Sequence, residues 1–277
     1  MNAEQEIPGL AEHWRVDDIP FGLLEPAPVR SNPDLFYLLA AASFVEITSD
    51  LYTQTLLACF ADDPPVADWL RDIWEPQEIQ HGVALRRYLG RVWPEFDWHE
   101  AYARFHAEYS RRCRTEFLAP TPTLEFAARC VVETGTASLY TMIHALSPEP
   151  VLRVLTRWIR DDEIHHYRYF YHAFVRYRGR EPARRRDVAR ILFRRIRTID
   201  NEDGYLSFKH AYLARHPQET DARRMYKSFK KRCFRLARQY YPYEMAAKML
   251  LKPLALNPRL RRATVPLLAA GARCLRS

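Results

Sequence analysis

Residues 74–82 read WEPQEIQHG and residues 161–166 read DDEIHH, so the chain carries the pattern Glu-x-x-His twice. The two pairs are Glu78 with His81 and Glu163 with His166. Positions i and i+3 of an α-helix share a face, so each pair directs a carboxylate and an imidazole to the same place. The repeat therefore predicts two matching sets of polar ligands on helical segments.

A further glutamate precedes each pair at a similar distance. Glu46 lies 32 residues before Glu78, and Glu133 lies 30 residues before Glu163. Both of these glutamates fall on stripes of apolar residues that recur every three to four positions, which is typical of the buried face of a helix. The order Glu, Glu-x-x-His, Glu, Glu-x-x-His thus extends over four successive long segments.

Burial of these carboxylates requires a compensating cation. A single carboxylate on the apolar face of a buried helix is costly, and several together are tolerated only when a cation neutralises them. Four carboxylates and two imidazoles that converge inside a helical bundle form the ligand set of a centre with two metal ions. Oxygen and nitrogen ligands without thiolate suit iron or manganese better than structural zinc. The predicted ligands are Glu46, Glu78, His81, Glu133, Glu163 and His166.

A competing interpretation places these side chains on solvent-exposed helix faces. Glu125, Arg129 and Glu133 lie at positions i, i+4 and i+8, which is the spacing of a surface ladder of ion pairs. His165 belongs with the surface side chains in either interpretation, because it is rotated by about 100° from the face of its neighbour His166.

The rest of the sequence is helical in pattern. Glycine is scarce, with eight residues in 277, and no convincing strand alternation occurs. We predict an all-α fold with an irregular segment at residues 1–32, a helical bundle at residues 33–178 and a basic helical extension at residues 179–277. Helices are expected at about residues 33–57, 65–90 with a kink or new start at Pro76, 97–114, 123–146, 148–177 after a Ser147 cap, 183–199, 203–214 and 219–239, followed by a proline-interrupted tail from Pro253.

The motifs resemble those of soluble acyl-carrier-protein desaturases, a branch of the ferritin-like di-iron superfamily. Residues 74–82 are similar to the W-x-x-E-E-x-x-H-G segment of that family, with Gln77 in place of the first of the two adjacent glutamates. Residues 161–166 resemble its second D-E-x-x-H motif, and residues 133–136 keep its glutamate and the threonine three positions on. The resemblance covers about residues 33–178, roughly half of the chain.

The resemblance implies a ferritin-like four-helix bundle with additional C-terminal helices. The six ligands named above would hold two Fe ions, or one Fe and one Mn, with O₂ as co-substrate. Asp162 would orient the metal-binding His81 from outside the ligand set, and Thr136 would handle protons one helical turn from the metal. A solvated Asp162 and a Thr136 that only packs between helices are the alternatives.

The implied activity is that of an O₂-dependent non-haem di-iron oxidoreductase acting on a long apolar substrate, a carrier-bound fatty acyl chain in the desaturases. Alternatives with the same ligand set are a hydroxylase or N-oxygenase of small-molecule biosynthesis and a ferroxidase or iron-handling protein. No GxGxxG nucleotide fingerprint occurs, so electrons are expected from a separate donor such as a ferredoxin. The resemblance also implies a homodimer.

Charge is distributed unevenly along the chain. Residues 1–178 hold 17 Lys and Arg against 26 Asp and Glu, a net charge of −9, whereas residues 179–277 hold 25 against 8, a net charge of +17. The basic third fits three interpretations: solvated helix faces, a docking surface for an acidic carrier protein, or peripheral contact with an anionic membrane through residues 254–275. No nucleic-acid-binding motif accompanies the charge, so nucleic acid is not an expected partner.

Three features of the sequence bear on where in the cell the protein is located. Residues 1–10 lack the basic and apolar regions of a secretory signal. The five cysteines form no CxxC and leave an odd number, which favours a reducing compartment. The longest apolar run, residues 35–45, is short of the roughly 20 residues that a membrane span requires. We therefore expect a soluble, cytoplasmic protein.

Overall fold

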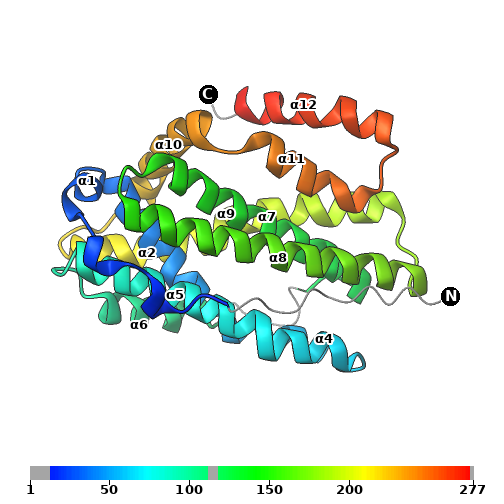
Figure 1. Cartoon of the computed structure of the whole chain (residues 1–277), viewed down its shortest axis with the longest axis horizontal. Coiled ribbons are helices and arrows are strands. Elements are labelled where there is room, and N and C mark those ends of the chain that lie inside the picture. Colours follow the sequence, from blue (N-terminus) through cyan, green and yellow to red (C-terminus); the bar gives the residue numbers. More distant parts are fainter. Residues whose placement is uncertain (1–12, 112–117, 275–277) are drawn as a thin grey trace.

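The structure, a computed structural model, describes residues 13–111 and 118–274, except for the side chains of residues 199–203. Within these ranges every regular element is helical and no strand occurs, which confirms the all-α prediction (Figure 1). The longer helices are α2 (Pro33–Ile47), α3 (Ser49–Cys59), α5 (Glu75–Val92), α6 (Trp98–Tyr109), α7 (Pro122–Leu146), α8 (Pro150–Arg180), α9 (Arg185–Arg215), α10 (Ala222–Tyr240), α11 (Tyr243–Leu251) and α12 (Pro258–Cys274).

The segment before α2 is irregular where it is described. It contains only η1 (Val16–Asp18), η2 (Phe21–Leu23) and the short helix α1 (Pro26–Arg30). Residues 1–12 of the predicted irregular segment lie outside the described part.

The helix expected at residues 33–57 is two helices, so that prediction is wrong. α2 and α3 meet at Thr48 with a bend of 41°. The hydroxyl of Thr48 donates to the carbonyl of Phe44, one turn earlier, and lies 3.3 Å from the hydroxyl of Tyr102. A hydroxyl that bonds back to the carbonyl four residues earlier bends a helix, and this bend follows directly after Glu46.

The helix that carries the first motif begins in two stages. α4 (Pro64–Trp69) leads into η3 (Leu70–Trp74), a π-helical turn, and α5 follows without a break. The amide of Glu75 donates to the carbonyl of Leu70, five residues earlier, just before Pro76 enters the helix. Proline cannot donate to the helix ladder, so this wider turn resets the helix at Pro76, as predicted.

α7 and α8 form a long helical pair that carries the second half of the candidate ligands. The predicted cap of α8 was placed at Ser147, but the helix begins at Pro150 with Glu149 as its cap. The carboxylate of Glu149 accepts from the amides of Val151 and Leu152, and it also accepts from the hydroxyl of Tyr88 on α5. A carboxylate can accept from more of the unpaired backbone amides in the first turn than a serine hydroxyl can, so the helix begins two residues later than predicted.

The C-terminal third differs from the prediction in two places. The helices expected at residues 183–199 and 203–214 are one continuous helix, α9, which continues through Gly204. A Cβ added at Gly204 would lie only 2.6 Å from the hydroxyl oxygen of Tyr226 on α10. The absence of a side chain at Gly204 therefore lets α9 pass close to Tyr226. The proline-interrupted tail contains η5 (Lys252–Leu254) and the helix α12, which accommodates Pro266 internally.

The predicted helix at residues 97–114 is present as α6, with Asp97 as its cap. The carboxylate of Asp97 accepts from the amide of Glu100 at 2.9 Å. α6 ends at Tyr109, and the rest of the predicted span, residues 112–114, lies outside the described part.

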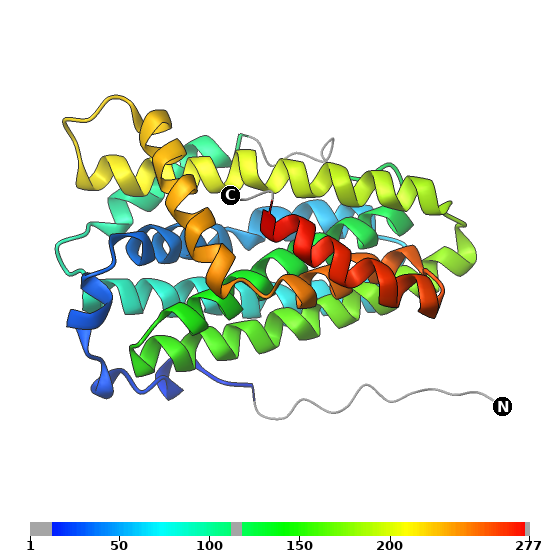
Figure 2. The same ribbon diagram turned by 90° about the horizontal axis from the view of Figure 1, so that it is seen from above.

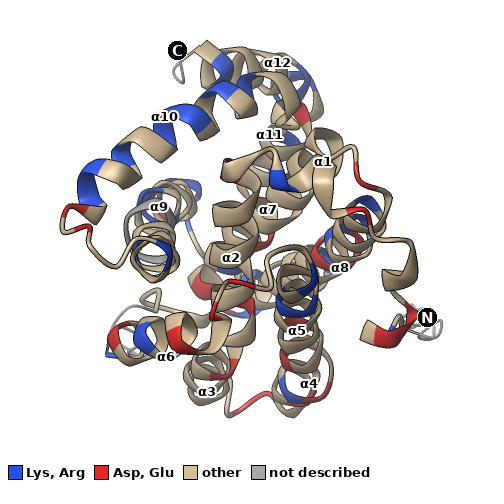
Figure 3. Ribbon diagram, turned by 90° about the vertical axis from the view of Figure 1, so that its left-hand side faces the viewer, with Lys and Arg blue, Asp and Glu red and all other residues tan. Residues whose placement is uncertain are grey.

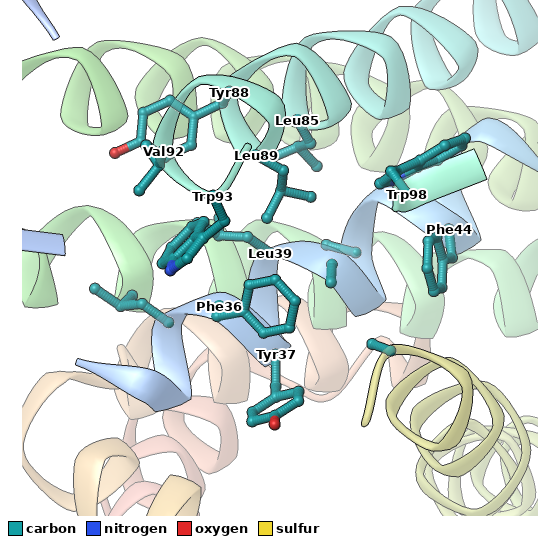
Figure 4. Close-up of a cluster of buried hydrophobic side chains, with 14 of the residues drawn as sticks. Phe36, Tyr37, Leu39, Phe44, Leu85, Tyr88, Leu89, Val92, Trp93 and Trp98 are labelled. Atoms are coloured by element: carbon teal, nitrogen blue, oxygen red, sulfur yellow. The ribbon is translucent and has the colours of Figure 1, made fainter. Parts of the chain in front are cut away.

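Apolar side chains from both ends of the chain form the largest core cluster. Aromatic rings of α2 pack against the end of α5 and the start of α6: Phe36 contacts Trp93 at a centroid distance of 5.2 Å, and Phe44 contacts Trp98 at 5.5 Å (Figure 4). Phe208 of α9 belongs to the same cluster. The C-terminal helices therefore help to build the core.

A second apolar cluster lies at the other end of the long helices, and polar residues separate the two. On α7 the second cluster ends at Val131 and the first begins at Tyr140. On α8 the first cluster ends at Ile159 and the second begins at Tyr167. The candidate ligands of α7 and α8 lie in these gaps, so the two clusters enclose a polar layer in mid-bundle.

The described helices are too short or too polar to be single membrane spans. None of them alone is long and apolar enough to cross a bilayer, and only α2 and α3 together, bent by 41°, reach the required length and composition.

Candidate metal centre

The structure brings all six predicted ligand residues into one layer, from four helices. Glu46 lies at the end of α2, Glu78 and His81 lie in the first two turns of α5, Glu133 lies in α7, and the last pair lies in α8. Every one is buried, with exposed fractions of 7% or less. The complete set is Glu46, Glu78, His81, Glu133, Glu163 and His166.

The six side chains form two overlapping groups of four. The first group adds Glu46 and His81 to Glu78 and Glu163, and within it the chosen ligand atoms lie within 4.8 Å of one another. The second group adds Glu133 and His166 to the same two glutamates. Each group can hold a metal ion, and the shared carboxylates lie between the two positions.

The imidazoles face the carboxylates across short distances. His81 Nδ1 lies 3.3 Å from Glu163 Oε1 and 3.7 Å from Glu46 Oε2. His166 Nδ1 lies 3.0 Å from Glu78 Oε1 and 3.6 Å from Glu133 Oε2. Each histidine thus approaches one shared carboxylate and the unshared glutamate of its own group.

Several inward-facing atoms of this layer lack hydrogen bonds. Five of them are buried without a partner, and such atoms are uncommon in folded proteins because their desolvation is not compensated. A cation bound at each position would compensate them, so the donor set fits a pair of metal ions. The five atoms are Glu78 Oε1, His81 Nδ1, Glu133 Oε1, Glu163 Oε1 and His166 Nδ1.

The far nitrogen of each ligand histidine is held by an acceptor on the facing helix. Asp162 Oδ2 lies 3.0 Å from His81 Nε2, which is the contact predicted for Asp162. Gln77 Oε1 lies 2.8 Å from His166 Nε2. With these acceptors each histidine carries a proton on Nε2, and Nδ1 is the nitrogen directed into the layer.

Asp162 and Gln77 occupy equivalent positions, since each directly precedes a shared glutamate. Gln77 stands out in the sequence as a departure from the desaturase motif, and its partner on the other helix was not predicted. The two ligand histidines therefore differ in support: a carboxylate holds His81 and a neutral amide holds His166.

Two residues of the irregular N-terminal segment also reach Asp162. His13 Nε2 lies 2.9 Å from Asp162 Oδ2, and Trp14 Nε1 donates to the same oxygen at 2.7 Å. The Trp14 ring stacks on the His81 imidazole, with centroids 6.0 Å apart and planes inclined by 4°. Sequence reasoning missed both residues, because the segment has no periodicity and lies about 150 positions from its partner.

Two hydroxyls of α7 bond to ligand carboxylates. Thr136 Oγ1 donates to Glu163 Oε2 at 2.6 Å, close to the position predicted for Thr136. Tyr140, which is fully buried, donates its hydroxyl to Glu46 Oε1 in a short hydrogen bond. Tyr140 lies seven residues after Glu133 on the same helix face, and that spacing was the only signal for it in the sequence.

Protonation in this layer reflects burial and mutual repulsion. Burial and the negative charges of neighbouring carboxylates, Glu163 above all, raise the pKa of Glu78 and of Glu133 well above the ordinary value. For Glu46 the effect of burial is outweighed by the nearby imidazole of His81, which lowers its pKa. Burial lowers the pKa of His166 to about 4, so its imidazole is neutral and able to bind metal at pH 7.

His81 and Asp162 form a charged pair without metal. Burial would lower the pKa of His81, but the hydrogen bond to Asp162 and the nearby carboxylates raise it well above the ordinary value. For Asp162, burial is outweighed by hydrogen bonds with His13 and His81, which lower its pKa. A metal ion at His81 must therefore displace a proton from Nδ1.

The interpretation of Glu125, Arg129 and Glu133 as an exposed ladder is wrong. All three are buried, with exposed fractions of 0%, 4% and 1%. Arg129 Nε donates to Glu125 Oε1 at 2.9 Å, and Arg195 of α9 lies 3.5 Å from the same oxygen. His165, by contrast, is exposed as expected.

A surface hollow of about 580 Å³ lies away from the candidate metal centre. It is bounded by η1, α5 and the turn before α6, with Val83, Arg86 and Trp98 among its lining residues. None of the six candidate ligands lines it, so it has no direct connection to the chemistry of the polar layer.

The chain matches no protein-family model and no curated protein sequence.

Proposed function

We propose that this chain is an O₂-dependent non-haem di-iron oxidoreductase with a ferritin-like helical bundle, and that it acts on a long apolar substrate. The observation that carries the proposal is the pair of buried four-residue groups that share Glu78 and Glu163. Unpaired, inward-facing oxygens and nitrogens from α5, α7 and α8 are an energetic cost that two bound cations would remove.

The residues divide into terminal, shared and supporting roles. Glu46 and His81 would hold one ion, Glu133 and His166 would hold the other, and Glu78 and Glu163 would hold both. Bound iron would supply O₂ activation and the oxidising power to attack an unactivated C–H bond, with electrons from an external donor such as a ferredoxin.

The chain itself supplies orientation, proton handling and exclusion of water. Asp162 and Gln77 fix the two imidazoles with Nδ1 directed inward. Thr136 holds its hydroxyl proton against Glu163 Oε2, where it can move between the carboxylate and a reacting oxygen. The apolar clusters on both sides of the layer exclude water, which suits an oxidation that water would interrupt.

Metal content tests the proposal directly. Protein loaded anaerobically with Fe(II) should bind about two ions per chain, and the His166→Ala variant should lose most of the second ion because one terminal ligand is gone. His165→Ala is the matched control, since it removes the adjacent, exposed imidazole of the same helix and should leave binding unchanged. Circular dichroism should give the same helix content for all three proteins.

Three outcomes would contradict the proposal. A folded chain that stays metal-free with Fe(II), or a His166→Ala variant with full occupancy, would show that the polar layer is not a di-metal site. If the loaded protein consumed O₂ only while free Fe(II) was added, and never when chemically reduced in the presence of apolar substrates, the site would be a ferroxidase.

A further inference from the structure

The outer face of α12 is apolar although it faces solvent. Val265 is the buried residue of this helix and packs with Ala247 and Leu251 of α11. At 100° per residue, Leu260 and Leu267 are rotated by about 140° and 160° from Val265, so they point away from the protein. Their exposed fractions are 46% and 71%.

Small and basic residues complete this face. Ala263 and Ala270 are exposed on the same stripe as the two leucines. Arg259 and Arg273 are exposed on one side of the stripe, about 120° and 80° from Val265. Residues 245–277 contain no Asp or Glu. The helix thus presents an apolar stripe with arginines along one side and no acidic residue on it.

α10 adds a second, strongly basic surface. Residues 222–240 hold eight Lys and Arg and no Asp or Glu. Lys227, Lys231, Arg235 and Arg238 recur every three to four residues and are all exposed, so they form one basic stripe along the outside of the helix. The opposite side of α10 is anchored to the core through Phe229 and through Arg232, which pairs with Asp34 of α2 at 2.9 Å.

The two helices lie on the same side of the molecule. In Figure 2 both α10 and α12 are on the side nearest the viewer. Figure 3 shows the basic residues along α10 and places α12 at the opposite side of the fold from α4 and α6. The two helices that carry the apolar stripe and the basic stripe therefore lie on one side of the fold, which we call the α10–α12 face.

We propose that the α10–α12 face binds peripherally to an anionic lipid bilayer, with α12 lying in the interface. Leu260 and Leu267 would enter the boundary between headgroups and acyl chains. Arg259 and Arg273, on one side of the stripe, would extend to lipid phosphates, and the basic stripe of α10 would lie against the negatively charged surface. This inference rests on the C-terminal helices alone and is independent of the proposed oxidation chemistry.

A lipid surface fits this face better than an acidic protein. An acidic partner would match the basic stripe of α10, but carboxylates facing α12 would leave its outward leucines without apolar contact. A bilayer with anionic headgroups offers phosphates and hydrocarbon in adjacent layers, as the arginines and leucines of α12 require. The charge of +17 in residues 179–277 provides the long-range attraction.

Co-sedimentation of the full-length protein with large unilamellar vesicles tests the inference. At 0.1 M salt the protein should bind vesicles of phosphatidylglycerol and phosphatidylcholine, and it should not bind vesicles of phosphatidylcholine alone. Each basic residue near an anionic surface contributes about fivefold to the binding constant, so Lys227→Gln with Lys231→Gln should weaken binding about 25-fold. Leu260→Gln with Leu267→Gln should abolish measurable binding at 0.5 M salt, where insertion carries most of the affinity.

Matched variants on other surfaces provide the controls. Arg71→Gln with Arg104→Gln removes two exposed arginines from the α4 and α6 side, and Leu23→Gln removes a leucine that is 68% exposed. These variants should bind as the unmodified protein does, with unchanged circular dichroism. Failure to bind the anionic vesicles, or equal losses in control and α10–α12 variants, would overturn the inference. Salt-sensitive binding to a purified acidic acyl carrier protein without vesicle binding would also overturn it.

Discussion

At the scale of single residues, the two candidate metal positions differ in how their histidines are supported. A carboxylate, Asp162, accepts from His81, whereas an amide, Gln77, accepts from His166. An imidazole that is hydrogen-bonded to a carboxylate is a stronger metal ligand than one that is hydrogen-bonded to an amide. We therefore expect the position formed by Glu46 and His81 to bind metal more tightly than its neighbour.

Asp162→Asn tests this support. The substitution keeps the shape of the side chain but removes its charge, so metal affinity at the His81 position should fall about 10- to 100-fold, as measured by competition with a chelator. Asp161→Asn is the control, because Asp161 is 49% exposed and pairs with the adjacent Arg160. Equal affinities for the two variants would contradict the assigned role of Asp162.

At the scale of helices, the approach of α5 to α2 depends on one glycine. An added Cβ at Gly82 would lie 2.5 Å from the amide nitrogen and 2.9 Å from the Cα of Ile47. These are backbone atoms that cannot move aside as a side chain can. Gly82 follows His81 and Ile47 follows Glu46, so this close contact holds two ligands of the same metal position together.

Gly82→Ala should therefore destabilise the protein by about 1–3 kcal/mol, as determined by urea unfolding, and weaken metal binding at the Glu46–His81 position. Gly90→Ala is the matched control in the same helix. An added Cβ there meets nothing within 4 Å, so alanine should stabilise the protein by about 0.4–1 kcal/mol. A Gly82→Ala protein as stable as wild type would show that the helices can separate freely.

At the scale of the whole molecule, the polar layer makes stability depend on pH and on metal. Glu78, Glu133 and His81 have pKa values raised above their ordinary values, so the folded metal-free protein binds these protons more tightly than the unfolded chain does. The stability from such groups is present below their ordinary pKa and is lost as pH rises through the raised values. His166 and Glu46, whose pKa values are lowered, act oppositely, but their losses occur at acidic pH.

Thermal unfolding should show this dependence. As pH rises through the raised pKa values of Glu78, Glu133 and His81, the midpoint temperature of the metal-free protein should fall, because these groups lose protons in a buried site. Metal ions replace those protons, so the difference between the loaded and metal-free midpoints should widen over the same range. A difference independent of pH would contradict proton displacement from the ligand set.

The predictions that succeeded depend on local geometry. The Glu-x-x-His spacing and the apolar stripes identified all six residues of the polar layer, because a helix fixes which positions share a face. The cost of a buried carboxylate then explained why they must meet. The same local reasoning identified Asp97 as a helix cap and Pro76 as the point where the helix restarts.

The sequence by itself thus determined the all-α class and the residues of the candidate centre. Only the tertiary structure decided what contacts them: His13 and Trp14 at Asp162, Gln77 at His166, and Tyr140 at Glu46. It also decided the bend between α2 and α3 and the outward direction of the leucines on α12. The physical reason is that helical periodicity depends on neighbours within four residues, whereas these contacts depend on how distant segments pack around a shared core.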